Sequence, residues 1–147
     1  MMKTKLNLPL PLPLYRGIVA EGLHQGKMIE GSALYSVIDG EDDISIAPAD
    51  NETLIRSIRP ETLGVYISKE DIDGKNIFTG DVLVDNCDIF IKYFLVYYDK
   101  ETCRFKLHSS IGKAPWNTTK YLSREKIIGN IHENPELLKL FPHLQGD

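Results

Sequence analysis

Apolar and polar residues alternate along several short stretches of this chain, and turn residues separate the stretches. Alternation at every second position is typical of half-buried strands, and it is clearest at Thr102–His108. Ser32–Ile38 is a strand candidate built around Ala33, Leu34, Tyr35, Val37 and Ile38, and Tyr15–Ala20 is a further short one. Asp39-Gly40 and Asp73-Gly74 are hairpin-type turn pairs, because glycine accepts a positive φ without steric cost. The pattern predicts an all-β chain.

The stretch Gly64–Val84 reads as a strand, a turn and a second strand region. It contains Thr79-Gly80-Asp81, which sets a carboxylate beside a tight bend. An aspartate in this position more often accepts a hydrogen bond from a local backbone N–H than performs chemistry. We therefore expect Asp81 to stabilise the bend.

The most apolar run of the chain is Cys87–Tyr98. Both of its faces are apolar at strand spacing, which predicts a central strand that is covered on both sides. A last strand is expected at Ile127–Ile131. Asn134-Pro135-Glu136 is a helix start, with Asn134 as N-cap and proline in the first turn, so we predict one short helix over residues 133–142.

Residues 1–14 form a separate arm in sequence terms, because Leu6–Leu14 alternates leucine with Pro9, Pro11 and Pro13. The three missing N–H groups would all belong to one edge of an extended segment, which suits an outer strand or an arm. The arm would pack on its own core or on a neighbouring subunit. A polyproline ligand for an aromatic groove is the functional alternative.

Length and charge restrict the class of protein. A chain of 147 residues suits a single domain. The net charge of −4 argues against a general binder of nucleic acids or of membrane surfaces. No apolar run approaches a membrane span, and the prolines after Lys3 and Lys5 do not fit a signal peptide. A cytoplasmic location is therefore expected.

The sequence contains no catalytic or metal-binding signature. Its four histidines are scattered, and its two cysteines do not make a disulfide framework. A metal cluster of Cys87, Cys103 and His108 across a hairpin is conceivable but lacks the usual ligand spacing. We expect no cofactor, no metal and no catalytic residue, and we interpret the chain as a protein other than an enzyme.

One segment departs from the acidic average. Six basic residues and a single acid lie between positions 104 and 126, interleaved with aromatic residues. Such a segment suits single-stranded nucleic acid, pairing with the acidic Asp39–Glu52 segment within the chain or across a subunit boundary, or an ordinary surface. The candidate surface for nucleic acid or for a partner consists of Arg104, Lys106, Lys113, Trp116, Lys120, Tyr121, Arg124 and Lys126.

Three motifs of the chain are distinctive: Pro60–Tyr66 (PETLGVY), Asp73–Val82 (DGKNIFTGDV) and Ile127–Leu138 (IIGNIHENPELL). Together they resemble the YopX family of phage and prophage proteins. Tyr15-Arg16-Gly17 and Lys27–Ser32 are similar to the family's opening motifs, so the resemblance covers most of residues 15–140.

The chain departs from the family's motifs at several positions, which indicates a divergent member. Val65, Ile67-Ser68 and Asp73 replace the usual residues, and Met28 lies near an expected tryptophan. The resemblance implies a small, mostly β domain with an SH3-like barrel element, encoded by a phage or prophage. It implies no activity, cofactor or catalytic residue. The recurring residues look like turn and core positions: Gly64, Gly74, Gly80, Asp81, Gly129, Asn130 and Pro135.

These observations combine into one hypothesis. The fold is an all-β SH3-like barrel or pseudo-barrel over residues 60–132, with a β extension at 15–59 and a short helix at 133–142. The protein is non-catalytic and acts by binding or by homo-oligomeric assembly in the bacterial cytoplasm, with itself or a host or phage protein as partner. The alternatives are a single-stranded nucleic-acid-binding module that uses residues 104–126, and a small enzyme of unknown reaction.

Overall fold

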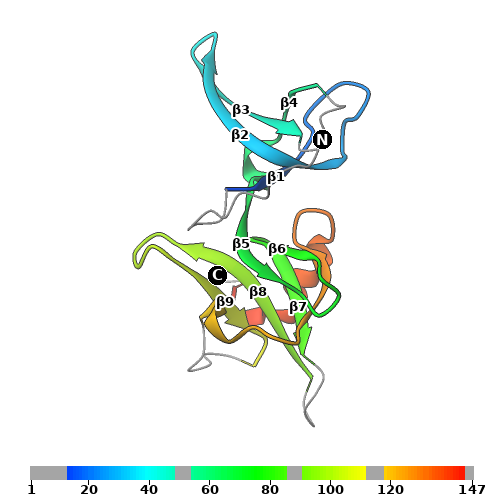
Figure 1. The fold of residues 1–147 in the computed structure, drawn as a ribbon, viewed down its shortest axis with the longest axis vertical. Helices are drawn as coiled ribbons and strands as arrows, with labels where there is room; N and C mark the ends of the chain where they lie inside the picture. Colours follow the sequence, from blue (N-terminus) through cyan, green and yellow to red (C-terminus); the bar gives the residue numbers. More distant parts are fainter. Residues whose placement is uncertain (1–12, 49–53, 86–90, 112–117, 145–147) are drawn as a thin grey trace, which may run out of the picture.

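The computed structural model describes residues 13–48, 54–85, 91–111 and 118–144. It is mainly β, as predicted, and consists of two antiparallel sheets (Figure 1). The segments that lie outside the described residues include most of the leucine-proline arm and the first part of the predicted strand at Cys87–Tyr98. Turn residues separate the successive elements along the chain.

The first sheet has six strands in the order β4-β3-β2-β1-β5-β6. The bounds of its strands are β1 Tyr15–Ile18, β2 Met28–Ile38, β3 Glu41–Pro48, β4 Arg56–Ser57, β5 Gly64–Glu70 and β6 Asn76–Phe78. A one-turn 3-10 helix, η1 Pro60–Thr62, precedes β5. Because β1 pairs with both β2 and β5, the expected β extension and the start of the expected barrel share one sheet.

The second sheet has four strands in the order β10-β7-β8-β9. Its strands are β7 Asp81–Asp85, β8 Lys92–Asp99, β9 Arg104–Ser109 and β10 Lys126–Asn130, with the 3-10 helix η2 Thr119–Tyr121 before β10. The chain passes from the first sheet to the second between β6 and β7, where Gly80 has a φ of 92°. A residue with a Cβ would be strained at that bend.

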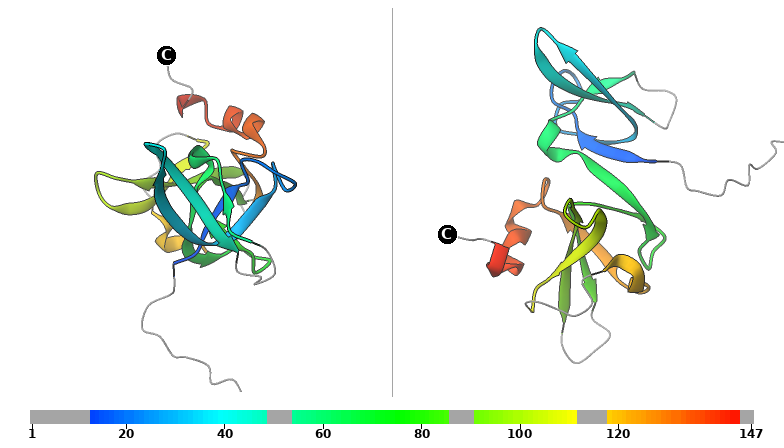
Figure 2. Two further views of the ribbon diagram at one scale, coloured as in Figure 1. Left: turned by 90° about the horizontal axis from the view of Figure 1, so that it is seen from above. Right: turned by 90° about the vertical axis from the view of Figure 1, so that its left-hand side faces the viewer.

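Two core clusters lie on the two faces of β8, so the predicted two-sided strand is confirmed from Tyr93 to Val96; Val19, Ile46 and Ile58 are buried in the first sheet as well. Val96 packs in a cluster with residues of β5, β6, β7 and β9. Leu95, on the opposite face, packs against Phe141 and the leucines of the C-terminal segment. Figure 2 shows the C-terminal segment beside the second sheet. Ile91 and Tyr98, the first and last described residues of the predicted run, are exposed.

The SH3-like barrel is not confirmed, because the two sheets stay open within the described residues. A closed barrel needs continuous strand pairing around its circumference. Here β6 ends the first sheet, and β9 and β10 form the two edges of the second. The connection through Gly80 places the sheets next to each other without pairing β6 to β7.

The predicted C-terminal helix is present but is a 3-10 helix, η3 Pro135–Leu140, followed by the short η4 Pro142–Leu144. The side chain of Asn134 does not cap η3. Its Oδ1 atom accepts from the backbone N–H of Asn130 at 3.3 Å instead. Among the described residues no helix is long and apolar enough to cross a membrane.

Candidate functional site

The junction between the two sheets contains a buried ion pair. The guanidinium of Arg16, on β1, donates to Oδ1 of Asp81, on β7, at 2.6 Å, and the two side chains are 9% and 1% exposed. The other carboxylate oxygen of Asp81 accepts from the Phe78 N–H at 2.8 Å. The expected local bond of Asp81 is therefore present, and the ion pair adds a long-range contact that the sequence pattern did not indicate.

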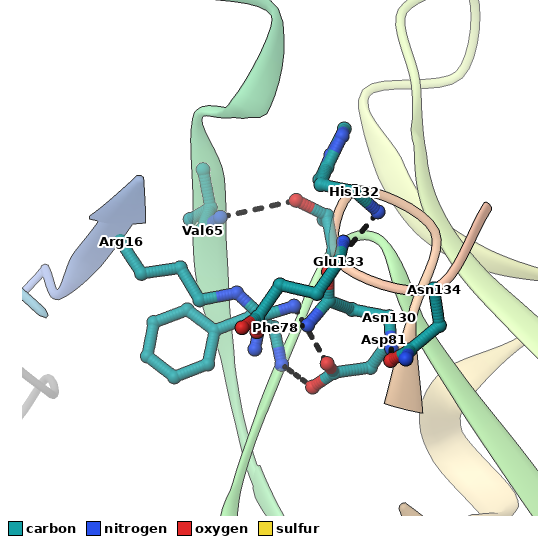
Figure 3. A network of polar contacts seen from close by, with 9 residues as sticks. Arg16, Val65, Phe78, Asp81, Asn130, His132, Glu133 and Asn134 are labelled. Atoms are coloured by element: carbon teal, nitrogen blue, oxygen red, sulfur yellow. Dashed lines mark hydrogen bonds and ion pairs between the residues drawn. The ribbon is translucent and has the colours of Figure 1, made fainter. Parts of the chain in front are cut away.

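Arg16 reaches Asp81 by crossing the neighbouring strand at Gly64, its partner in the β1–β5 ladder. A Cβ at position 64 would lie 3.3 Å from Cγ of Arg16 and 3.0 Å from the Thr79 carbonyl oxygen. The guanidinium then lies over the ring of Phe78, 4.7 Å from its centroid (Figure 3). The packing of a cation on an aromatic face adds to the ion pair.

Burial is the largest influence on the pKa of Asp81 and raises it, while the charge of Arg16 and the Phe78 N–H act in the opposite direction. Nε of Arg16 is buried without a hydrogen-bond partner and lies against Gly64. The pair therefore carries a real desolvation cost, which is characteristic of buried charges that specify how elements dock.

The turn after β10 completes the junction. Oδ1 of Asn130 accepts from the N–H groups of His132 and Glu133, and its Nδ2 donates to Glu133 Oε1 at 2.8 Å (Figure 3). The N–H of Ile131 donates to the Gly80 carbonyl at 3.0 Å. These bonds hold the turn after β10 against the bend between the sheets. Asn130 and Gly80 are therefore turn residues, as the sequence predicted.

His132 of this turn lies next to Gly80, where an added Cβ would be 3.3 Å from its Nε2. Burial lowers the pKa of His132, and the positive charges of Arg16 and Arg59 lower it further, against an opposing effect of Glu61. The ring is therefore neutral at physiological pH and acts as a packing group.

A cleft of about 350 Å³ opens beside the ion pair. Two cations and two carboxylates line it, so it attracts neither an anion nor a cation by net charge. Its polar lining comes from both sheets and includes Arg16, Glu30, Lys75, Asn76, Asp81 and Asn130. The charged groups of Arg16 and Asp81 bind each other, so in the cleft they connect the two sheets.

The structure separates Cys103 from His108, which the conceivable metal cluster would bring together. Cys103 is exposed in the β8–β9 turn, where Sγ donates to the Lys100 carbonyl. His108 lies on β9, four residues beyond its first residue Arg104 and roughly 13 Å from it at strand spacing, and its ring stacks on that of Tyr97 with 3.8 Å between the centroids. Cys87 lies outside the described residues, in which no group of three potential ligands is close enough to hold a metal ion.

The basic segment runs from β9 through η2 to β10, and three of its described members form ion pairs with acidic residues. Lys106 pairs with Asp99 at 2.8 Å. Arg124 pairs with Asp85 at 3.4 Å, and Lys126 with Asp73 at 3.7 Å. Arg104 is exposed, and the carbonyl oxygen of Lys120 accepts a hydrogen bond from Lys69. The remaining members lie outside the described residues: Lys113, Trp116 and the Tyr121 side chain.

The alternative that these basic residues pair with Asp39–Glu52 within the chain is not seen in the ion pairs of Lys106, Arg124 and Lys126. Their partners are carboxylates of the second sheet and of the Asp73 turn. The described part of the acidic segment, residues 39–48, belongs to the β2–β3 hairpin, at the end of the molecule far from β9 and β10 (Figures 1 and 2). Separate sheets hold the two segments apart.

The β2–β3 hairpin is the feature that sequence reasoning missed as a site. Four large apolar side chains at its distal end are exposed to solvent: Leu34 at 46%, Tyr35 at 67%, Val37 at 59% and Ile38 at 55%. The signal was present in the sequence, because adjacent positions of both parities are apolar there while β3 opposite carries Glu41 and Asp42. Tyr35 Oη donates to Oδ1 of Asp42 at 2.5 Å, a bond that raises the pKa of Tyr35.

Comparisons with known proteins bear on the family of the chain. No curated protein matches it. A solved structure, that of protein EF1440 from Enterococcus faecalis, is similar with 19% sequence identity and a TM-score of 0.47, over 86% of this chain and 98% of that one. The family model described as YopX protein matches residues 15–139. The resemblance seen in the three sequence motifs is thereby confirmed, and the chain belongs to the YopX protein family.

Proposed function

We propose that this protein is a non-catalytic, phage- or prophage-encoded protein of the bacterial cytoplasm that acts by binding, and that it assembles with a second copy of itself through the distal β2–β3 hairpin. One observation carries the proposal: four large apolar side chains are exposed within residues 34–38, two on each face of β2. Exposed apolar patches of this kind mark interaction sites.

The hairpin also needs support on structural grounds. Beyond Gly31, β2 pairs with β3 but no longer with β1, whose ladder ends at Tyr15–Gly31. Beyond Tyr35, where β3 also no longer bonds to the strand region of β4, the hairpin is a two-stranded ribbon, which is of marginal stability in water without a further strand or a covered face. A partner that covers the ribbon would provide both.

The charge of the hairpin favours a protein partner over a nucleic acid. Its turn and β3 carry Asp39, Glu41 and Asp42, all exposed, and no basic residue lies between Gly31 and Pro48. Such a surface repels phosphate groups. The neighbouring apolar positions on β2 suit a second apolar edge, and a second copy of this chain offers one.

Static light scattering across the micromolar range tests the proposal. We expect the wild-type protein to pass from monomer to dimer as its concentration rises, since an interface formed by one hairpin of each copy is small and binds weakly. Val37→Lys places a charge in the patch and should keep the protein monomeric. Ile72→Lys is the matched control, because Ile72 is equally exposed but lies at the turn before β6. A wild-type protein that stays monomeric throughout would contradict the proposal.

A titration with single-stranded oligonucleotide at low salt tests the nucleic-acid alternative. The chain contains one tryptophan, Trp116, within the basic segment, so its fluorescence reports on binding there. Because Lys106, Arg124 and Lys126 already face carboxylates, we expect no change in fluorescence. Quenching that weakens with added salt would favour the alternative.

A further inference from the structure

The open edge of β2 is defined by the direction of its backbone groups. Ile44 on β3 is the ladder partner of Tyr35, and its carbonyl oxygen accepts from the N–H of Ile58 at 2.9 Å, away from β2. Directly opposed residues of an antiparallel pair point either toward each other or away from each other. The N–H and C=O of Tyr35 therefore point away from β3, and by alternation so do those of Ala33 and Val37.

The same parity holds nearer the base of the hairpin. The N–H of Val19 donates to the Lys27 carbonyl at 2.9 Å, and Tyr15 opposes Gly31. From Lys27 to Gly31, the backbone N–H and C=O groups of odd-numbered residues therefore point toward β1. Past Gly31 that side has no strand among the described residues. Ala33, Tyr35 and Val37 thus present a row of backbone donors and acceptors to solvent.

The chain's own N-terminal segment is poorly suited to fill this edge. A β1 strand continued in its register would set Pro13 opposite Ala33, and the sequence has Pro11 and Pro9 at the positions that follow. Proline has no N–H, so each of these pairs could form one of its two hydrogen bonds at most. The donors of the edge could be used, but its acceptors would remain without partners.

The two edges of the ribbon differ in charge. The distal part of β2 has no charged residue from Ser32 to Ile38, whereas Glu41, Asp42 and Asp43 occupy the distal part of β3. Two copies that met through β3 would place carboxylates opposite carboxylates, which is destabilising. Two copies that met through β2 would keep the acidic strands on the outside.

We propose that two copies of the chain pair β2 to β2 in antiparallel orientation about a twofold axis at Ser36, which forms a four-stranded sheet in the order β3-β2-β2-β3. This inference rests on the proposed function and names its edge and register. A twofold interface uses the same patch on both copies, and residues 34–38 are symmetric in character about Ser36: two apolar residues, a serine and two apolar residues.

The register at Ser36 matches apolar with apolar side chains throughout. It sets Leu34 opposite Ile38 of the other copy and Tyr35 opposite Val37, each pair occurring twice. A twofold axis at Tyr35 would instead oppose Leu34 to Ser36. In the Ser36 register Tyr35 and Val37 exchange four backbone hydrogen bonds across the axis, and the small serine occupies a non-hydrogen-bonded position, where side chains approach most closely.

Disulfide trapping of Ser36→Cys tests the register. Ser36 is exposed, so the substitution leaves the monomer intact, and Cα atoms of a non-hydrogen-bonded pair lie about 4.5 Å apart, within reach of a disulfide. We expect mild oxidation to yield a dimer whose 36–36 cross-linked peptide is identified by mass spectrometry. Ala33→Cys is the control and should remain uncross-linked at position 33, because the register sets that residue opposite the turn.

Amide hydrogen exchange is a second test of the β2–β2 register, and it needs no substitution. The N–H groups of Tyr35 and Val37 should exchange more slowly as the protein concentration rises. A wild-type dimer in light scattering that forms no 36–36 disulfide and leaves these two amides unprotected would overturn the β2–β2 register while the proposed self-assembly stands. A monomer at all concentrations would overturn both.

Discussion

Arg16 of the first sheet and Asp81 of the second meet in a buried ion pair of 2.6 Å at the bend where the chain passes between the sheets. The two residues are separated by 65 positions in sequence. Phe78, Gly64 and the turn after β10 surround the pair. It joins the sheet that carries the exposed hairpin to the sheet that carries the core clusters around β8.

Breaking the pair from one side should be costly. Arg16→Met leaves a buried carboxylate without its cation, and we expect a loss of about 3–5 kcal/mol in the free energy of unfolding. Urea unfolding measures the change. The double variant Arg16→Met, Asp81→Leu removes both charges, and it should be more stable than Arg16→Met alone. If the single variant unfolds like the wild type, Arg16 and Asp81 do not join the sheets.

Gly64 should be required for the path of the Arg16 side chain. Gly64→Ala sets a Cβ 3.0 Å from the Thr79 carbonyl oxygen and 3.3 Å from Cγ of Arg16, so we expect a destabilisation of about 1–3 kcal/mol from overpacking. Differential scanning calorimetry measures the change. Gly74→Ala is a useful comparison, because Gly74 has open space around it and a φ of 81°, and it isolates backbone strain from crowding.

Asp71 should make stability depend on pH in the acid range. Burial acts to raise its pKa, but the N–H groups of Ile127, Lys75 and Asp73 together outweigh that effect, and the pKa is lowered. A carboxylate with a lowered folded-state pKa stabilises the fold above its unfolded-state pKa of about 3.9. That stabilisation is lost as the pH falls through the folded-state value.

The measurement is the free energy of unfolding of the wild type and of Asp71→Asn from neutral pH down to the acid transition. At neutral pH the variant should be less stable by about 1–3 kcal/mol, because charge-assisted bonds to three N–H groups are weakened. The difference should shrink as the pH falls. A constant difference would show that ionised Asp71 does not hold the turn to β10.

A charge-swap pair probes the register of the proposed interface from its side chains. Leu34→Glu and Ile38→Lys should each prevent self-association, because each places unpaired charges opposite apolar side chains. Mixed together, they should form a heterodimer, since the register sets the new glutamate of the first variant opposite the new lysine of the second and leaves the other Leu34–Ile38 pair intact. Native mass spectrometry of the mixture, with each variant alone as control, distinguishes these species.

Local sequence patterns predicted the strands because alternation and turn pairs act over a few residues. Asp39-Gly40 does form a hairpin turn with both φ angles positive, and Leu95 and Val96 do lie buried on opposite faces of β8. The change of sheet at Gly80 depends on long-range contacts such as that of Arg16 with Asp81, which no short pattern contains. Local patterns therefore did not indicate how the sheets meet, and the barrel implied by the family resemblance is replaced by two sheets that stay open within the described residues.

The candidate site was predicted less well for a similar reason. The basic segment stood out by composition, but its charges are matched by Asp73, Asp85 and Asp99, which belong to other strands and turns. The apolar hairpin looked like an ordinary strand, because sequence alone does not reveal that β1 stops pairing at Gly31. Exposure is decided by the neighbours of a strand and not by its own residues.

Sedimentation velocity of the wild-type protein over a series of concentrations, beside Val37→Lys, is the decisive measurement for assembly through the β2–β3 hairpin. We expect a wild-type sedimentation coefficient that rises from monomer to dimer with concentration, and a variant that sediments as a monomer throughout. A wild-type protein and a variant that sediment identically at every concentration would contradict assembly through this hairpin.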